Sequence, residues 1–201
     1  QASALAVVAI EQFTLNTFKW FFNSDNPEAQ TALKQFQTAL HHADYRIVEE
    51  SLEHAELSGM GTTLTLAYHL DGRVCVVHVG DSRAYIFEGD ALRQITHDHT
   101  VPEDMVRRGE LQPEQVAQHP LRHVITNVVG GIEAGVYVEA HALDVHAGDR
   151  LLLCSDGLTE MVTNEAIATV LRAESDPAAA CKTLVAQAND AGGRDNITVV
   201  I

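Results

Sequence analysis

Cysteine is scarce in this sequence of 201 residues, which contains three, at positions 75, 154 and 181. An odd number of widely spaced cysteines, without a Cys-x-x-Cys pair, provides neither a disulfide framework nor a zinc knuckle. Cys75 and Cys154 lie within apolar runs that are typical of strands. We therefore expect both to be unreactive thiols of the hydrophobic core.

Basic residues are also few. Lys and Arg number 13 against 28 Asp and Glu, which gives a formal net charge of -15. Proteins that bind nucleic acid carry clustered Lys and Arg on one surface, and no such cluster occurs here. Nucleic acid is therefore excluded as a partner, and we expect bound cations to offset part of the acidity.

Long hydrophobic runs are absent as well. No apolar stretch approaches the about 20 residues that cross a bilayer, and the first residues show neither the basic start nor the cleavage pattern of a signal peptide. We expect a cytoplasmic protein without a membrane partner. The hydrophobic content of 46% fits one globular domain, residues 1–201.

The first quarter of the chain has helical periodicity. Apolar residues recur along one face from Ala4 to Phe22. The segment from Ser24 to Glu28 combines cap-type residues with a proline suited to a first helical turn, which predicts a second helix extending to about Leu57. The residues expected to face the core are Leu33, Phe36, Leu40, Ile47 and Leu52.

Strand periodicity begins after Gly59, and Asp71-Gly72 is a hairpin signal. Strands are predicted at residues 63–68, 74–79, 84–87 and 92–95, and we expect them to form one antiparallel meander. A mixed segment from His97 to Gly131 is interpreted as an inserted, flap-like subdomain. The elements predicted within and after it are a helix at 101–108, a turn or short helix at 113–115, strands at 136–140 and 150–154, helices at 164–171 and 177–189, and a strand at 197–201.

Two acidic turns adjoin the last buried-type strands. Ser155-Asp156-Gly157 follows the apolar run Leu151–Cys154, and Gly193-Arg194-Asp195-Asn196 precedes the run Ile197–Ile201. A carboxylate at the junction of strand and loop can hold a hard divalent cation through oxygen. Taken alone, both aspartates are equally compatible with ordinary turn residues.

Two further segments occur earlier, Gly59-Met60-Gly61-Thr62-Thr63-Leu64 and Val79-Gly80-Asp81-Ser82-Arg83-Ala84-Tyr85. In this order and at these separations, the four segments resemble the PPM family of metal-dependent protein phosphatases, the type 2C serine/threonine phosphatases, and bacterial members in particular. The resemblance covers nearly the whole chain from Ala2 to Ile201. It implies an α+β fold, a four-layer α-β-β-α sandwich in which helices flank two antiparallel sheets.

The resemblance also implies a ligand set for two Mn²⁺ or Mg²⁺ ions. Asp156 and Asp195 match the family's metal-binding aspartates, and Asp98 matches a ligand of a third, weaker metal, although Asp98 could as well cap the helix that follows it. His97 and His99 flank Asp98, but zinc is disfavoured because no further ligands occur at zinc spacing. Asp81 is expected to be structural, paired with Arg83 or bonded to backbone N–H groups.

A metal pair of this kind would activate water for hydrolysis of phosphoserine and phosphothreonine in proteins. Three family features are missing from the sequence: an early Arg, an Asn-Glu-Asp stretch and the Asp-Gly-x-Gly-Gly turn whose Asp bridges the metals. We therefore expect the chain to be an internal piece of a longer domain, weakly active or inactive alone. The alternatives are a catalytically dead, phosphatase-like binding or regulatory module, and a phosphatase dedicated to one regulatory partner.

Overall fold

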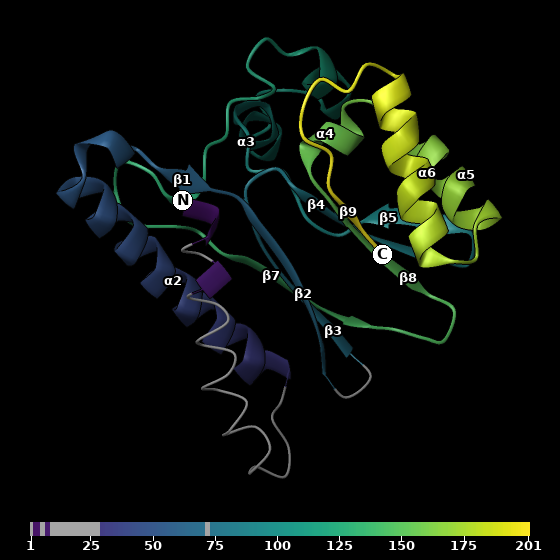
Figure 1. Ribbon diagram of the computed structural model, residues 1–201, viewed down its shortest axis with the longest axis horizontal. Helices are drawn as coiled ribbons and strands as arrows, with labels where there is room; N and C mark the ends of the chain where they lie inside the picture. The colour runs from purple at the N-terminus through teal and green to yellow at the C-terminus, as the bar shows by residue number, and fades with distance from the viewer. Residues whose placement is uncertain (1, 5–6, 9–28, 71–72) are drawn as a thin grey trace. The chain divides into compact units, whose positions relative to one another are not determined.

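The computed structural model describes residues 2–4, 7–8, 29–70 and 73–201. These divide into two compact units (Figure 1). Unit 1 comprises residues 1–80 and 99–144, and unit 2 comprises residues 81–98 and 145–201. The predicted helix from Ala4 to Phe22, the cap at residues 24–28 and the turn at 71–72 lie largely or wholly outside the described residues.

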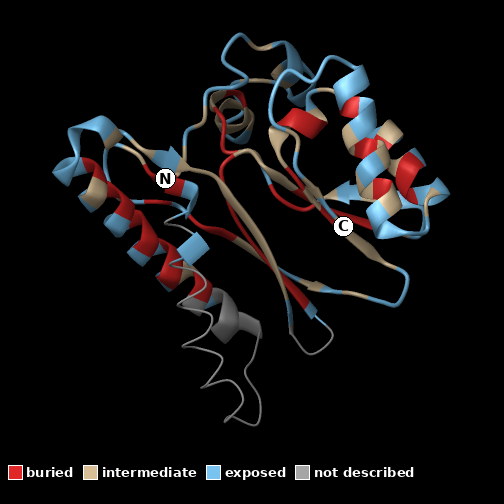
Figure 2. Cartoon of the chain, in the orientation of Figure 1, coloured by how far each residue is buried: buried red, intermediate tan, exposed pale blue. Residues whose placement is uncertain are grey.

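The long helix of unit 1 is α2 (Ala29–Glu53), followed by the 3₁₀ turn η1 (Ala55–Leu57). One face of the described part of α2 is buried and the opposite face is exposed (Figure 2), and Phe36, Leu40 and Ile47 are buried as predicted. The prediction that Leu52 faces the core is wrong, because Leu52 is 78% exposed. Five residues after Ile47, Leu52 lies about 140° around the helix, whereas Ser51, one turn after Ile47, is buried.

Helix α2 packs against the strands of unit 1. The main sheet has the order β2-β3-β7 and is antiparallel throughout. Its strands are β2 (Leu64–Leu70), β3 (Arg73–Val79) and β7 (Glu139–Asp144), and a separate pair joins β1 (Gly61–Thr62) to β6 (Val129–Gly130). The strand predicted at 136–140 therefore begins later, at Glu139, and extends further.

The predicted meander is wrong at its middle connection. Strand β3 pairs with β2 and β7, whereas the next strand, β4 (Arg83–Glu88), belongs to another sheet. Both edges of β3 are already occupied, by β2 and β7, so β4 cannot pair with β3. Between the two strands, Gly80 has φ +110° and a Cβ there would lie 2.3 Å from Thr63 Cγ2, so only glycine fits this position.

Unit 1 also contains residues 99–131 of the mixed segment. Helix α3 (Val101–Arg107) and the 3₁₀ helix η2 (Pro113–Gln118) lie where the sequence predicts them. Asp44 of α2 is buried, and its carboxylate accepts hydrogen bonds from the backbone N–H groups of Gly130, Gly135 and Val136, at 2.6, 2.7 and 3.1 Å. A single side chain thereby anchors the loop that follows β6.

Unit 2 is built on an antiparallel sheet of order β5-β4-β8-β9. Besides β4, its strands are β5 (Ala91–Gln94), β8 (Arg150–Cys154) and β9 (Val199–Val200), and its helices are α4 (Asp156–Thr159), α5 (Asn164–Ala173) and α6 (Pro177–Asp190). Asp176 caps α6, accepting a hydrogen bond from Ala179 N at 2.9 Å. Thr163 caps α5, its hydroxyl accepting a hydrogen bond from Ala166 N at 3.3 Å.

The fold is thus mixed α+β with antiparallel sheets. Cys75 and Cys154 are free and buried in the strands, as expected. Burial raises the pKa of the Cys154 thiol to about 12, which keeps this sulfur protonated and unreactive. Among the helices described, none combines the length and apolar character needed to cross a bilayer.

Candidate metal centre

The turns that carry Asp156 and Asp195 lie side by side in unit 2. Strand β9 pairs with β8 through Cys154 and Val199, which brings the chain segments around both aspartates together. Ser155 joins them: its N–H donates to Thr198 O at 3.1 Å, its hydroxyl donates to Asn196 O at 3.0 Å and accepts from Thr198 N at 3.0 Å. The two turns are therefore fixed to each other by three hydrogen bonds from one serine.

Gly157 allows this close approach. A Cβ at this position would lie 2.4 Å from Asn196 O, a distance that real Cβ atoms essentially never show, and 3.0 Å from Asn196 C. The residue is buried at the start of α4. The glycine of the Ser-Asp-Gly turn is thus required by the neighbouring turn, and not by a positive φ.

Each of the two carboxylates accepts a hydrogen bond, through one oxygen, from the backbone N–H of the residue that follows it. Asp156 Oδ1 accepts from Gly157 N at 2.9 Å, and Asp195 Oδ1 accepts from Asn196 N at 2.6 Å. Within the described part of the chain, neither carboxylate receives a hydrogen bond from a side chain. Asp156 is half-buried and Asp195 is exposed. Both therefore keep oxygen lone pairs that a hard cation could use.

Asp98 is engaged by Arg83. The guanidinium holds it in a bidentate pair, Nε to Oδ1 at 2.8 Å and Nη2 to Oδ2 at 2.7 Å, and also donates to Tyr85 Oη at 3.1 Å. Arg83 therefore pairs with Asp98, whereas Asp81 accepts a hydrogen bond from its own backbone N–H, the second of the two alternatives expected for it. The alternative in which Asp98 caps the following helix is wrong, because the N-cap residue is Thr100.

Asp81 is a candidate that sequence reasoning undervalued. Burial raises the pKa of its carboxyl to about 6, and the negative charges of Asp156 and Asp98 add to the increase, while its own backbone N–H and the charge of Arg83 oppose it. Asp81, Asp98 and Asp156 thus form an acidic group that a cation would stabilise. The available signal was the position of Asp81 directly after a buried strand, the same signal that singled out Asp156.

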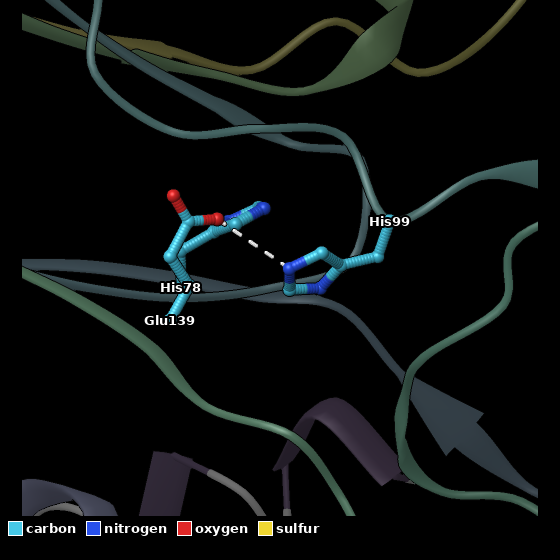
Figure 3. Close-up of side chains that lie close together, drawn as sticks. All are labelled: His78, His99 and Glu139. Atoms are coloured by element: carbon cyan, nitrogen blue, oxygen red, sulfur yellow. Dashed lines mark ion pairs between the residues drawn. The ribbon is translucent and has the colours of Figure 1, made fainter. Parts of the chain in front are cut away.

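These aspartates do not form a compact ligand cage. In the part of the chain that the structure describes, no set of three His, Cys or carboxylate ligand atoms within 4.8 Å of one another includes Asp81, Asp98, Asp156 or Asp195. Such a set does occur in unit 1, at His78, His99 and Glu139 (Figure 3).

The hydrogen bonds of that trio do not suit a metal. His78 Nε2 faces Gly80 O at 3.0 Å and must donate, while its Nδ1 accepts from the Thr65 hydroxyl at 2.9 Å. His99 Nδ1 accepts from Gly80 N at 3.0 Å, so its proton resides on Nε2. No ring nitrogen of the two histidines is left with a free lone pair directed at Glu139. Both rings are fully buried.

Known proteins of one family match this chain over most of its length. A family model described as protein phosphatase 2C matches residues 1–190. The serine/threonine phosphatase stp of Listeria innocua is 34% identical over 165 residues, which cover 82% of this chain and 65% of that protein. The protein phosphatase PhpP of Streptococcus pneumoniae is 36% identical over 143 residues, covering 71% of this chain and 58% of that protein. The chain therefore spans about two thirds or less of the length of these relatives.

Solved structures of a bacterial serine/threonine phosphatase also resemble this chain. The crystal structure of the Mycobacterium tuberculosis serine/threonine phosphatase PstP/Ppp matches with a TM-score of 0.84 and 32% identity, covering 99% of this chain and 79% of that one. A structure of the PstP catalytic domain in complex with two manganese ions matches with a TM-score of 0.81 and 31% identity, covering 99% and 78%.

Proposed function

Because this chain belongs to the protein phosphatase 2C family, we propose that the protein containing it is a metal-dependent protein serine/threonine phosphatase. Its substrates are phosphoserine and phosphothreonine residues of other proteins, and its reaction is hydrolysis of the phosphomonoester by water. The observation that carries the proposal is the adjacency of the Asp156 and Asp195 turns, held by Ser155. A scaffold protein would need neither carboxylate at this junction.

The proposed arrangement of the whole domain is the four-layer α-β-β-α sandwich. Support comes from the antiparallel sheet in each unit, from the helices packed on each, and from the similarity to PstP. We place the activity in the cytoplasm, which agrees with free, buried Cys75 and Cys154.

The donor chemistry fits Mn²⁺ or Mg²⁺. Asp156 and Asp195 would hold the metal pair, and Asp98 would contribute to a third, weaker site after exchanging part of its pairing with Arg83. All three offer carboxylate oxygens, the donors these hard cations prefer over thiolate or imidazole. Bound there, the metals would lower the pKa of water and neutralise phosphate oxygens. A structure of PstP with two manganese ions supports the choice of metal.

The chain's own residues fix the geometry in which this chemistry would occur. Ser155 sets the spacing of the two turns, and Gly157 permits their contact. The pKa of Asp81 is raised first by burial and then by the negative charges of Asp156 and Asp98, and this negative charge attracts cations to the site. Water activated by the metals would be the nucleophile, so neither Ser82 nor Ser155 is required to attack the phosphate.

The test is hydrolysis of p-nitrophenyl phosphate and of a phosphothreonine peptide by the natural full-length protein, with and without Mn²⁺. Asp156→Ala and Asp195→Ala should each lower kcat/KM by about 100-fold or more, since they remove ligands of the group that activates water. Asp144→Ala is the matched control: its carboxylate forms an exposed pair with Arg73, and such pairs contribute little.

Hydrolysis that persists in chelator, or that both variants leave unchanged, would contradict the proposal. No hydrolysis of either substrate by the wild type, despite a folded protein, would favour the alternative of a non-catalytic, phosphatase-like module.

A further inference from the structure

Gly80 is held on both sides of its backbone by buried histidines. Its carbonyl oxygen accepts from His99 N at 2.7 Å and from His78 Nε2 at 3.0 Å, and its N–H donates to His99 Nδ1 at 3.0 Å. His78 and His99 are 0% and 1% exposed, and their ring centroids lie 4.9 Å apart. We call Gly80, His78 and His99 the histidine clamp.

The clamp joins two points of the chain that flank acidic residues. Gly80 directly precedes Asp81, and His99 directly follows Asp98. Asp81 and Asp98 belong to the acidic group described above, together with Asp156. The segment between the two clamp positions, residues 81–98, begins with Asp81 and ends with Asp98. Hydrogen bonds between residues 80 and 99 therefore hold the two ends of this segment together, which limits how far the two carboxylates can move apart.

We infer that His99 is a positioning residue: its Nδ1 lone pair fixes the Gly80 backbone and thereby holds Asp81 and Asp98 in place for cation binding. The inference rests on the proposed function. It assigns the role to one nitrogen of the ring, because the two nitrogens have different surroundings.

The tautomer of His99 is set by its neighbours. Asn127 Oδ1 accepts from Tyr137 N at 3.0 Å and Asn127 Nδ2 donates to Tyr137 O at 2.7 Å, which fixes the orientation of this amide. Asn127 Nδ2 consequently also donates to His99 Nδ1, at 2.8 Å. With two donors directed at it, Nδ1 carries no proton and acts as an acceptor only.

The other nitrogen contributes much less. Figure 3 marks the ion pair between His99 and Glu139, in which Nε2 and Oε2 lie 3.4 Å apart, but His99 Nε2 is buried and makes no hydrogen bond within the described chain. Glu139 is bonded more closely on its other oxygen, by His141 Nε2 at 2.6 Å. Loss of the Nε2 side of His99 should therefore matter little, and loss of the Nδ1 acceptor should matter most.

Two substitutions separate these effects. Asn and Leu have nearly the same shape, and Asn Oδ1 can occupy the position of His Nδ1, whereas Leu offers no acceptor. Both variants lose the contact with Glu139 and the same ring volume. His99→Asn therefore keeps the acceptor for Gly80 N–H, and His99→Leu leaves that buried N–H unpaired.

The experiment uses the natural full-length protein and two readouts: Mn²⁺ binding by calorimetric titration, and amide hydrogen exchange at Gly80 and Asp81 in metal-free protein. His99→Asn should bind Mn²⁺ within about 3-fold of wild type, while His99→Leu should bind about 10-fold more weakly and exchange the Gly80 amide at least about 10-fold faster. His141→Leu, which removes the bond to the other oxygen of Glu139 and leaves His99 and Gly80 in place, is the control and should match wild type.

Equal Mn²⁺ affinity and equal exchange in His99→Asn and His99→Leu would overturn the inference. If Asn were as damaging as Leu, the ring or its Nε2 would be the important part, and the assignment to Nδ1 would be wrong. If the wild type bound no Mn²⁺, the proposed function would fail instead, and the exchange rates alone would then decide whether the clamp exists.

Discussion

Gly157→Ala tests directly whether contact between the two acidic turns matters. The added methyl group would lie 2.4 Å from Asn196 O and 3.4 Å from Ile197 Cγ1, so the turn that carries Asp195 must move away from α4. Overpacking of this kind costs about 1–3 kcal/mol. Alanine is favoured over glycine within a helix by about 1 kcal/mol, which offsets part of that cost.

The expected net result is a loss of stability of up to about 2 kcal/mol, or a decrease of up to about 8 °C in Tm for a chain of this size. The effect on catalysis should be larger. A displacement of a fraction of an ångström between two metal-binding groups is expected to lower kcat/KM by about 10- to 100-fold. Calorimetric unfolding and Mn²⁺-dependent p-nitrophenyl phosphate hydrolysis measure the two effects.

Gly148→Ala is the matched control within unit 2. Gly148 has φ +100° and nothing within 4 Å of an added Cβ, so alanine there is strained in its backbone without contacting other groups. This variant should lose stability to a similar extent while keeping wild-type kcat/KM. Wild-type activity in Gly157→Ala, or equal loss of activity in both variants, would refute the view that the spacing of the turns sets the metal site.

Two further predictions concern buried and half-buried carboxylates. Asp44→Asn should destabilise the protein by about 3 kcal/mol in urea unfolding, because an amide cannot accept from the N–H groups of Gly130, Gly135 and Val136 as the buried carboxylate does; an unchanged midpoint would contradict this role. Asp81→Asn should stabilise metal-free protein above about pH 6 by roughly 1 kcal/mol, after allowance for solvent screening, and have little effect below about pH 4. The folded-state pKa of Asp81 lies above its unfolded value, so the ionised group weakens folding as pH rises between these values; equal stability of variant and wild type at pH 8 in chelator would refute this.

Local motifs made part of the site predictable. Asp156 and Asp195 each adjoin a short apolar run, and β8 and β9 form there and pair, which brings the two turns together. The strand β8 was predicted with its observed bounds. A short apolar run next to a turn can be recognised within about ten residues of sequence. Strands of this kind can therefore be predicted without knowledge of the tertiary structure.

Choices between distant partners were not predictable. Arg83 had Asp81 two residues away and Asp98 fifteen residues away, and the nearer carboxylate was the natural expectation. The antiparallel pairing of β4 with β5 returns the chain toward the start of β4, with Ile95 N donating to Ala84 O. The returning chain places Asp98 next to the guanidinium of Arg83, and no local sequence pattern predicts this contact.

The same limit applies to the sheets. The predicted meander followed the order of strands in the sequence, but β3 takes β7 as its second neighbour, about sixty residues later. The histidine clamp was likewise not predictable, because His78 and His99 are 21 residues apart in the sequence and both bind the backbone of Gly80 only in the folded chain. Burial of a histidine depends on which strands flank it, and that is settled by tertiary pairing.

The hydroxyl of Ser155 donates to one backbone group and accepts from another on the opposite turn. Only serine or threonine can do both with one atom, and a torsional fluctuation of that side chain must disturb both bonds together. Vibrations of the two aspartate-bearing loops are thereby correlated, so thermal motion should translate the pair as a unit and leave the interval between the carboxylates nearly constant.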